Sequence, residues 1–169
     1  MKNNLLFMTF LLTSILSSCK QEPKPDPAIE LGRTNAEMTS KVHDLFSKNQ
    51  FDECTKYATP NVQIVAHSMG ASFNGQEEFL NFMAGFKQAF PDMVITHNNI
   101  LGIGEKVAVE FTAIGTHTGP LQTPNGAIPA SGKKVELKVS EFWEWKDGKI
   151  SKITNYQDAV SLLRQIGAM

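Results

Sequence analysis

The first half of the chain carries apolar residues every three or four positions, which is the spacing of amphipathic helices. Two such runs predict helices over residues 29–47 and 75–90, and a shorter helix is expected over residues 51–58. A strand is expected over residues 61–68 and a loop over residues 70–74. The apolar stripe of the first helix consists of Leu31, Met38, Val42, Leu45 and Phe46.

The second half alternates apolar and polar residues, which is the spacing of strands. Four strands are expected, over residues 93–101, 106–117, 133–145 and 149–156. Asp147-Gly148 predicts a tight hairpin between the last two strands. A long loop rich in glycine and proline covers residues 118–132, and a closing helix is expected over residues 158–166. Helices followed by a meander of strands predict an α+β domain, in which a curved antiparallel sheet closes over the helices.

The N-terminus has the pattern of a secretory signal peptide. Lys2 precedes an apolar run over residues 5–16 that is too short to span a bilayer comfortably. The tetrad Leu16-Ser17-Ser18-Cys19 is similar to the lipobox of bacterial lipoproteins, which implies a signal peptide over residues 1–18 and lipid attachment to Cys19. The alternative is an ordinary signal peptide with an incidental cysteine.

Residues 19–28 contain three prolines among polar residues and predict an extended tether. The remaining residues, 29–169, have the length of one ordinary domain. The predicted product is therefore a domain in the cell envelope, anchored through the lipid on Cys19 to a membrane outside the cytoplasm.

The charge and the cysteine content limit the classes of binding partner and of structural cross-link. Residues 19–169 carry 15 basic and 17 acidic side chains, because Lys2 is the only charge in the signal peptide. No basic patch stands out, which argues against nucleic acid as a partner. With Cys19 lipidated, Cys54 is the only cysteine left, so the sequence predicts no disulfide and no metal site, and Cys54 is expected to pack as a small apolar residue.

Five stretches of the domain match a known family in order and spacing. They are Ala89-Phe90-Pro91-Asp92, Gly115-Thr116-His117-Thr118-Gly119, Pro129-Ala130-Ser131-Gly132-Lys133-Lys134, Asp147-Gly148-Lys149-Ile150 and Leu162-Leu163-Arg164-Gln165-Ile166-Gly167. With these stretches the chain resembles the SnoaL-like polyketide cyclase (ester cyclase) family over essentially all of residues 29–167.

The resemblance implies a nuclear transport factor 2-like cone with a central pocket, often in homodimers. It also implies an intramolecular aldol condensation on a polyketide ester, without metal or cofactor, in which an aspartate on the closing strand acts as acid and base. The corresponding position of this chain holds Asn155. An amide forms hydrogen bonds but does not exchange a proton near neutral pH, so the family's mechanism would lack its central group.

Glu141 is a candidate for the missing proton chemistry. On strict alternation it shares one face of its strand with apolar side chains, so it has either a buried partner or a ligand. Burial is expected to raise its pKa, as suits a general acid or base. The apolar residues on the same face are Val135, Leu137, Val139, Trp143 and Trp145.

His117 and Asp158 are further catalytic candidates, each with a structural alternative. His117 ends a strand beside the 118–132 loop. It either has a functional role in the pocket or forms hydrogen bonds that hold the loop in place. Asp158 is either the N-cap of the closing helix or a base at the end of the preceding strand. Candidate ligand-binding residues are His67, Asn155, Trp143 and Tyr156, whereas His43 and His97 are expected to be solvated or capping.

Three classes of function follow. The first is an enzyme without cofactor that acts on a small apolar, carbonyl-bearing substrate through Glu141, His117 or Asp158. The second is a binding module in which Asn155 and His117 orient an apolar ligand without chemistry. The third is a dimeric scaffold that uses the outer face of the sheet.

Overall fold

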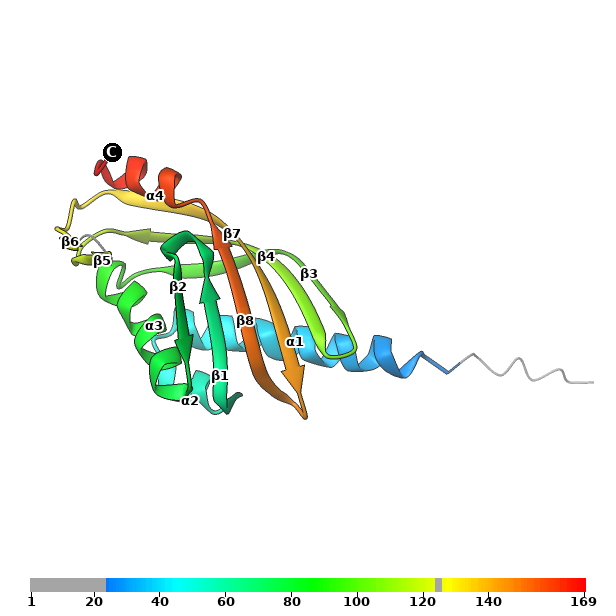
Figure 1. The fold of residues 1–169 in the computed structure, drawn as a ribbon. Helices are drawn as coiled ribbons and strands as arrows, with labels where there is room; N and C mark the ends of the chain where they lie inside the picture. The colour runs from blue at the N-terminus through cyan, green and yellow to red at the C-terminus, as the bar shows by residue number, and fades with distance from the viewer. Residues whose placement is uncertain (1–23, 124–125) are drawn as a thin grey trace, which may run out of the picture.

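A curved six-stranded sheet forms the frame of the domain, with the N-terminal helices packed against one of its faces and the C-terminal helix lying beside one strand (Figure 1). The computed structural model describes residues 24–123 and 126–169, so the expected signal peptide and Cys19 lie outside the described residues. Within these ranges no helix is both long enough and apolar enough to cross a membrane.

The helices are α1 (Pro27–Ser47), α2 (Phe51–Thr55), α3 (Gln76–Ala89), α4 (Ala159–Ile166) and the 3-10 turn η1 (His67–Met69). The strands are β1 (Ala58–Ala66), β2 (Ala71–Asn74), β3 (Val94–Ile103), β4 (Lys106–Thr116), β5 (Leu121–Thr123), β6 (Gly126–Ile128), β7 (Lys134–Lys146) and β8 (Lys149–Gln157). The helices α1, α3 and α4 and the strands β3, β4, β7 and β8 therefore lie where the sequence places them, whereas β1 begins three residues before the expected residue 61. Residues 71–74, expected as a loop, pair with β1 as a short strand, and the long loop contains the β5–β6 hairpin.

The strand order of the main sheet is β2-β1-β8-β7-β4-β3. The predicted α+β fold with a short closing helix is confirmed, but the sheet is mixed because β1 runs parallel to β8. The meander from β3 to β8 brings the last strand back beside β1, and the two strands point the same way (Figure 1). Register shifts in β3 and between β7 and β8 mark irregularities of the kind that bend strands.

Helix α1 approaches the sheet through a contact of backbone against backbone. Gly32 of α1 lies directly against Gly102 of β3, where a Cβ on either residue would overlap the backbone of the other. One turn on, Asn35 Nδ2 donates to the carbonyl of Gly104 at 2.8 Å. Thr39 Oγ1 then accepts from the indole of Trp145 at 3.2 Å. These contacts fix which face of α1 meets the sheet.

The predicted apolar stripe of α1 is confirmed except at Leu31, because Val42 is buried and Met38, Leu45 and Phe46 pack against the core. Leu31 is 43% exposed, and the buried positions are Gly32, Asn35, Thr39, Val42 and His43. Polar residues occupy this face because the sheet supplies partners for them. The apolar periodicity therefore found the apolar part of the buried face and missed the polar part beside it.

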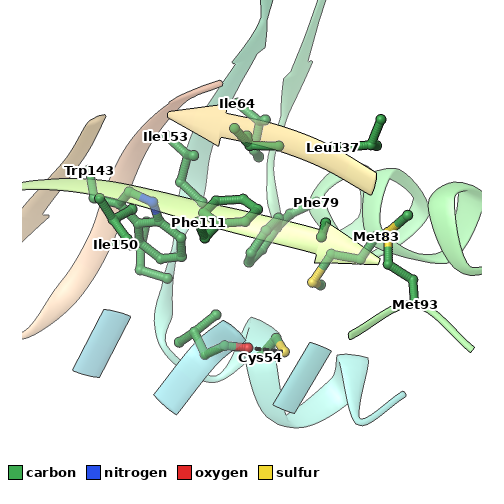
Figure 2. Close-up of a cluster of buried hydrophobic side chains, with 14 of the residues drawn as sticks. Cys54, Ile64, Phe79, Met83, Met93, Phe111, Leu137, Trp143, Ile150 and Ile153 are labelled. Atoms are coloured by element: carbon green, nitrogen blue, oxygen red, sulfur yellow. Dashed lines mark hydrogen bonds between the residues drawn. The ribbon is translucent and has the colours of Figure 1, made fainter. Parts of the chain in front are cut away.

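The hydrophobic core fills the space between the sheet and the helices (Figure 2). Phe79 and Met83 of α3 lie near Phe111 of β4 in this core. Cys54 is fully buried in the same layer and its thiol donates to the carbonyl of Val42 at 3.5 Å. Burial raises the pKa of the Cys54 thiol to about 12, so this residue is an inert packing group, as predicted.

Candidate functional site

A cavity of about 80 Å³ lies between the helices and the sheet. Most of its wall is apolar, and four phenylalanines and a methionine from α1 and α3 supply one side: Phe46, Phe79, Phe82, Met83 and Phe86. The polar side chains on the wall are those of His43, Glu141, Asn155 and Gln157. Pockets for drug-sized ligands typically have roughly 300–1,000 Å³. This cavity therefore suits a small molecule or one group of a larger one.

Glu141 is the centre of the polar wall. It is 6% exposed and lies on the same face of β7 as its apolar neighbours, as the alternation predicts. Its Oε2 accepts from Trp143 Nε1 at 2.8 Å and contacts His43 Nε2 at 3.1 Å. Its Oε1 accepts from Asn155 Nδ2 at 2.7 Å. A carboxylate oxygen has room for two donors, so Oε1 keeps one direction open.

The expectation of a raised pKa for Glu141 was wrong. Burial favours the protonated acid, but the hydrogen bonds of His43, Asn155 and Trp143 together outweigh it and hold the pKa of Glu141 below its ordinary value. Glu141 is therefore ionised at neutral pH. An ionised carboxylate can accept a proton from a ligand but cannot donate one in its resting state.

His43 was expected to be solvated or capping, and this expectation was wrong. It is 5% exposed, lines the cavity and lies against Glu141. The rings of Phe111 and Trp143 hold it edge-on, with centroids 4.7 and 5.2 Å away. The signal that would have found it is the spacing Asn35, Thr39, His43, because polar residues four apart share one face of a helix.

Asn155 lies directly across from Glu141 in the register of β7 and β8. The resemblance implies an aspartate at this position, so the chain has an amide there and a carboxylate on the neighbouring strand. The amide nitrogen of Asn155 is used by Glu141. Its Oδ1 is buried and has no hydrogen-bond donor among the described residues. Glu141 and Asn155 both line the cavity and are joined to each other by the hydrogen bond from Asn155 Nδ2 to Glu141 Oε1.

The structure brings three of the sequence-predicted site residues together: Glu141, Asn155 and Trp143. His117 lies outside the cavity wall and is fully buried beside Phe90. Its Nδ1 lies 3.1 Å from the hydroxyl oxygen of Ser131. The backbone of His117 also bonds Gly132 and Lys133, so this residue anchors the end of the 118–132 loop. Burial lowers the pKa of His117.

Asp158, His67 and Tyr156 also lie away from the cavity wall. The carboxylate of Asp158 accepts from the backbone N–H of Ser161 at 2.9 Å, which is the geometry of a helix N-cap. Exposed His67 stacks on exposed Tyr156, with centroids 4.5 Å apart. Within the described ranges no group of three or more His, Cys, Asp or Glu side chains is placed to hold a metal ion.

Comparisons with known proteins agree on the fold. A model of the SnoaL-like polyketide cyclase family matches residues 36–166. A proposed SnoaL-like polyketide cyclase from Jannaschia sp. has a TM-score of 0.74 at 21% identity, covering 82% of this chain and 95% of that chain. IdmH, a proposed polyketide cyclase from Streptomyces antibioticus, has a TM-score of 0.65 at 21% identity, with coverages of 78% and 97%.

A proposed ketosteroid isomerase from Kribbella flavida has a TM-score of 0.57 at 16% identity, with coverages of 75% and 79%. No curated protein matches the sequence. At these identities the structural similarities show a nuclear transport factor 2-like fold and nothing about the reaction.

Proposed function

Because the chain belongs to the SnoaL-like polyketide cyclase family, we propose that it is a cofactor-independent enzyme acting on a small, apolar, carbonyl-bearing substrate. The observation that carries the proposal is the buried Glu141 in a mostly apolar cavity wall, where hydrogen bonds from His43, Asn155 and Trp143 hold its pKa low. A carboxylate in a mostly apolar cavity is costly to bury and is a common base at carbon next to a carbonyl. In this proposal Glu141 is the base, in place of the aspartate that the family resemblance implies at position 155.

The proposed reaction starts at Glu141 Oε1, the oxygen that has a single hydrogen-bond donor. Oε1 takes a proton from the carbon next to the substrate carbonyl, and the electron pair of the broken C–H bond forms an enolate. The enolate carbon attacks a second carbonyl carbon of the same molecule, and the resulting alkoxide takes the proton back from Glu141. Asn155 orients the carboxylate throughout, and the apolar wall excludes water.

Replacing Glu141 by glutamine tests this proposal. We expect the wild-type protein to accelerate the exchange of α-hydrogens of small aryl ketones and β-keto esters with D2O, followed by NMR. E141Q should lose this acceleration by about 10²-fold or more, because an amide cannot accept the proton. The matched control is E144Q, which changes a carboxylate three positions along the same strand and outside the cavity wall.

E144Q should exchange at the wild-type rate. Retention of the acceleration in E141Q would remove Glu141 as the base, and no acceleration by the wild type for any probe would count against an enzyme. In that second case the alternative is a binding module. The amide at position 155 favours it, as does Asn155 Oδ1, which has no hydrogen-bond donor in the part of the chain that the structure describes. Native mass spectrometry of protein from its own host would then find a small ligand in the cavity.

We also propose that the domain is tethered in the cell envelope through a lipid on Cys19. The lipobox-like tetrad and the proline-rich residues after it support this proposal. In its host, the wild-type protein should take up an alkyne-labelled fatty acid and sediment with membranes. C19S should do neither, whereas C54S, which changes the buried cysteine, should keep the label. Labelling of C19S would refute attachment at Cys19.

A further inference from the structure

Four polar side chains form a continuous chain from the cavity toward the outside of the domain. Glu141 Oε2 lies 3.1 Å from His43 Nε2, and His43 Nδ1 lies 2.9 Å from His97 Nε2. His97 Nδ1 lies 3.4 Å from the hydroxyl of Ser40. Every ring nitrogen of both histidines takes part. His43 is buried, whereas His97 and Ser40 are half-buried, so the chain leads from the interior toward the surface between α1 and β3.

One set of neutral tautomers satisfies every contact in this chain. With both rings neutral and hydrogen on Nε2, Ser40 donates to His97, His97 donates to His43, and His43 donates to Glu141. The two rings are nearly parallel, at 17°, with centroids 5.1 Å apart. This arrangement suits an end-to-end N–H···N hydrogen bond.

Few charged groups surround this chain. Asp44 on α1 and Glu141 on β7 are the acidic groups that act on His97, and His43 is the other titratable neighbour. Burial lowers the pKa of His97, which favours its neutral form at pH 7. Phe111 and Trp143 pack against His43 and keep its ring in line. In the neutral tautomers described above the chain holds no extra proton, so a proton that enters at His97 can be passed on.

We propose that His43 and His97 form a proton relay that exchanges protons between Glu141 and solvent while the cavity stays closed. This inference builds on the proposed role of Glu141 as the base. A proton from solvent binds His97 Nδ1. The His97 Nε2–H bond then breaks as an N–H bond forms at His43 Nδ1, and the His43 Nε2–H bond breaks as an O–H bond forms at Glu141 Oε2. One proton has moved inward, both rings are neutral with hydrogen on Nδ1, and the reverse sequence moves it out.

The relay gives each oxygen of Glu141 a separate task. Oε1 faces Asn155 and takes the substrate proton, whereas Oε2 faces His43 and exchanges with solvent. A proton that the relay has delivered to Oε2 can return to solvent by the reverse sequence, because His43 Nε2 is then unprotonated. From the resting tautomers, in which His43 Nε2 carries hydrogen, the relay delivers protons to Glu141. His43 and His97 act through Glu141, so they are positioning residues in this scheme.

The test is the rate at which the hydrogen on His43 Nε2 exchanges with D2O, read from the ring N–H signal of ¹⁵N-labelled protein. In the wild type the relay carries this exchange. H97Q keeps a polar side chain beside His43 but cannot pass a proton between two ring nitrogens, so exchange should slow at least tenfold. If His97 were only structural, its loss would loosen the site and exchange would be faster. An unchanged or faster rate in H97Q therefore overturns the relay.

Two further variants complete the exchange experiment. S40A removes the hydroxyl that orders His97 and should slow exchange by a smaller factor. If circular dichroism shows that H97Q is unfolded, S40A becomes the test of the relay. An exchange rate of the His43 Nε2 hydrogen in S40A at or above the wild-type rate would then overturn the relay. K41Q is the matched control, since it changes an exposed side chain next to Ser40 and should exchange at the wild-type rate.

Activity gives a second and separate readout. With any substrate that the wild type turns over, H97Q should lower kcat about tenfold with KM unchanged, and added imidazole should restore part of the rate. A wild-type protein that turns over no probe but shows slow H97Q exchange would refute the proposed function and retain the relay. Normal activity in H97Q with inactive E141Q would refute the relay and retain the function.

Discussion

Replacing Gly32 by alanine is expected to lower the free energy of unfolding by about 3 kcal/mol. A Cβ at this position would overlap the backbone of Gly102 in β3. Backbone cannot turn aside as a flexible side chain can, so α1 must move away from the sheet. Urea unfolding followed by circular dichroism measures the change.

Gly85→Ala is the matched control for this prediction. Gly85 is also inside a helix, but a Cβ there would have no atom within 4 Å. Alanine is the better helix former by about 1 kcal/mol, so this variant should be slightly more stable than the wild type. Equal effects of the two substitutions would mean that α1 does not depend on its contact with Gly102.

The same contact links stability to the candidate site. Gly32 and His43 lie on one face of α1, so a helix displaced at Gly32 also moves His43 relative to Glu141. The polar partners between them, Asn35 and Thr39, are held by groups on the sheet. The close approach of two glycines is therefore what sets the geometry of the carboxylate and its imidazole.

The fold was largely predictable because periodicity is a local property of the chain. The alternation along residues 133–145 placed Glu141 on the buried face, and the structure confirms it. The parallel pairing of β1 and β8 was not predictable in this way, since it joins residues that lie about 90 positions apart. The polar face of α1 was also missed, because Asn35, Thr39 and His43 look solvated until the sheet that pairs with them is in place.

The site was predicted only in part, because its residues come from several elements of the fold. Glu141 could be found from its strand, but its protonation depends on donors from three elements. Desolvation alone argued for a raised pKa, whereas the bonds from His43, Asn155 and Trp143 lower it. The sequence contains each of these residues, but only the fold brings them to one carboxylate. The balance of burial against hydrogen bonding is a property of the assembled site.

Replacing Asn155 by aspartate should destabilise the protein strongly at high pH. Asn155 Nδ2 donates to Glu141 Oε1 at 2.7 Å, and N155D replaces this donor with a second carboxylate. Two carboxylates at that distance cannot both ionise without a large cost, so the pair should share one proton with a raised pKa. At pH 8, where the shared proton is lost, we expect the free energy of unfolding to fall by roughly 3 kcal/mol.

The pH dependence of N155D has the opposite sign to that of the wild type. The wild-type pKa of Glu141 is lowered, so its contribution is present above the unfolded value of about 4.3 and is lost as the pH falls through the folded pKa. In N155D the folded pair binds a proton that the unfolded chain has released. Stability therefore falls as the pH rises from about 5 through the raised pKa. Denaturant unfolding of the wild type and of N155D at pH 5 and pH 8 measures how the free energy of unfolding of each protein changes with pH.

The double variant E141Q/N155D provides the decisive comparison. It keeps one carboxylate and one amide in contact but exchanges their strands, which puts the acid where the family resemblance implies it. The pair of like charges is gone, so most of the stability lost by N155D at pH 8 should return. If the double variant is as unstable at pH 8 as N155D, the loss comes from packing at position 155 and not from the two charges. If it is stable, its α-hydrogen exchange activity shows whether an aspartate on β8 can replace a glutamate on β7 as the base.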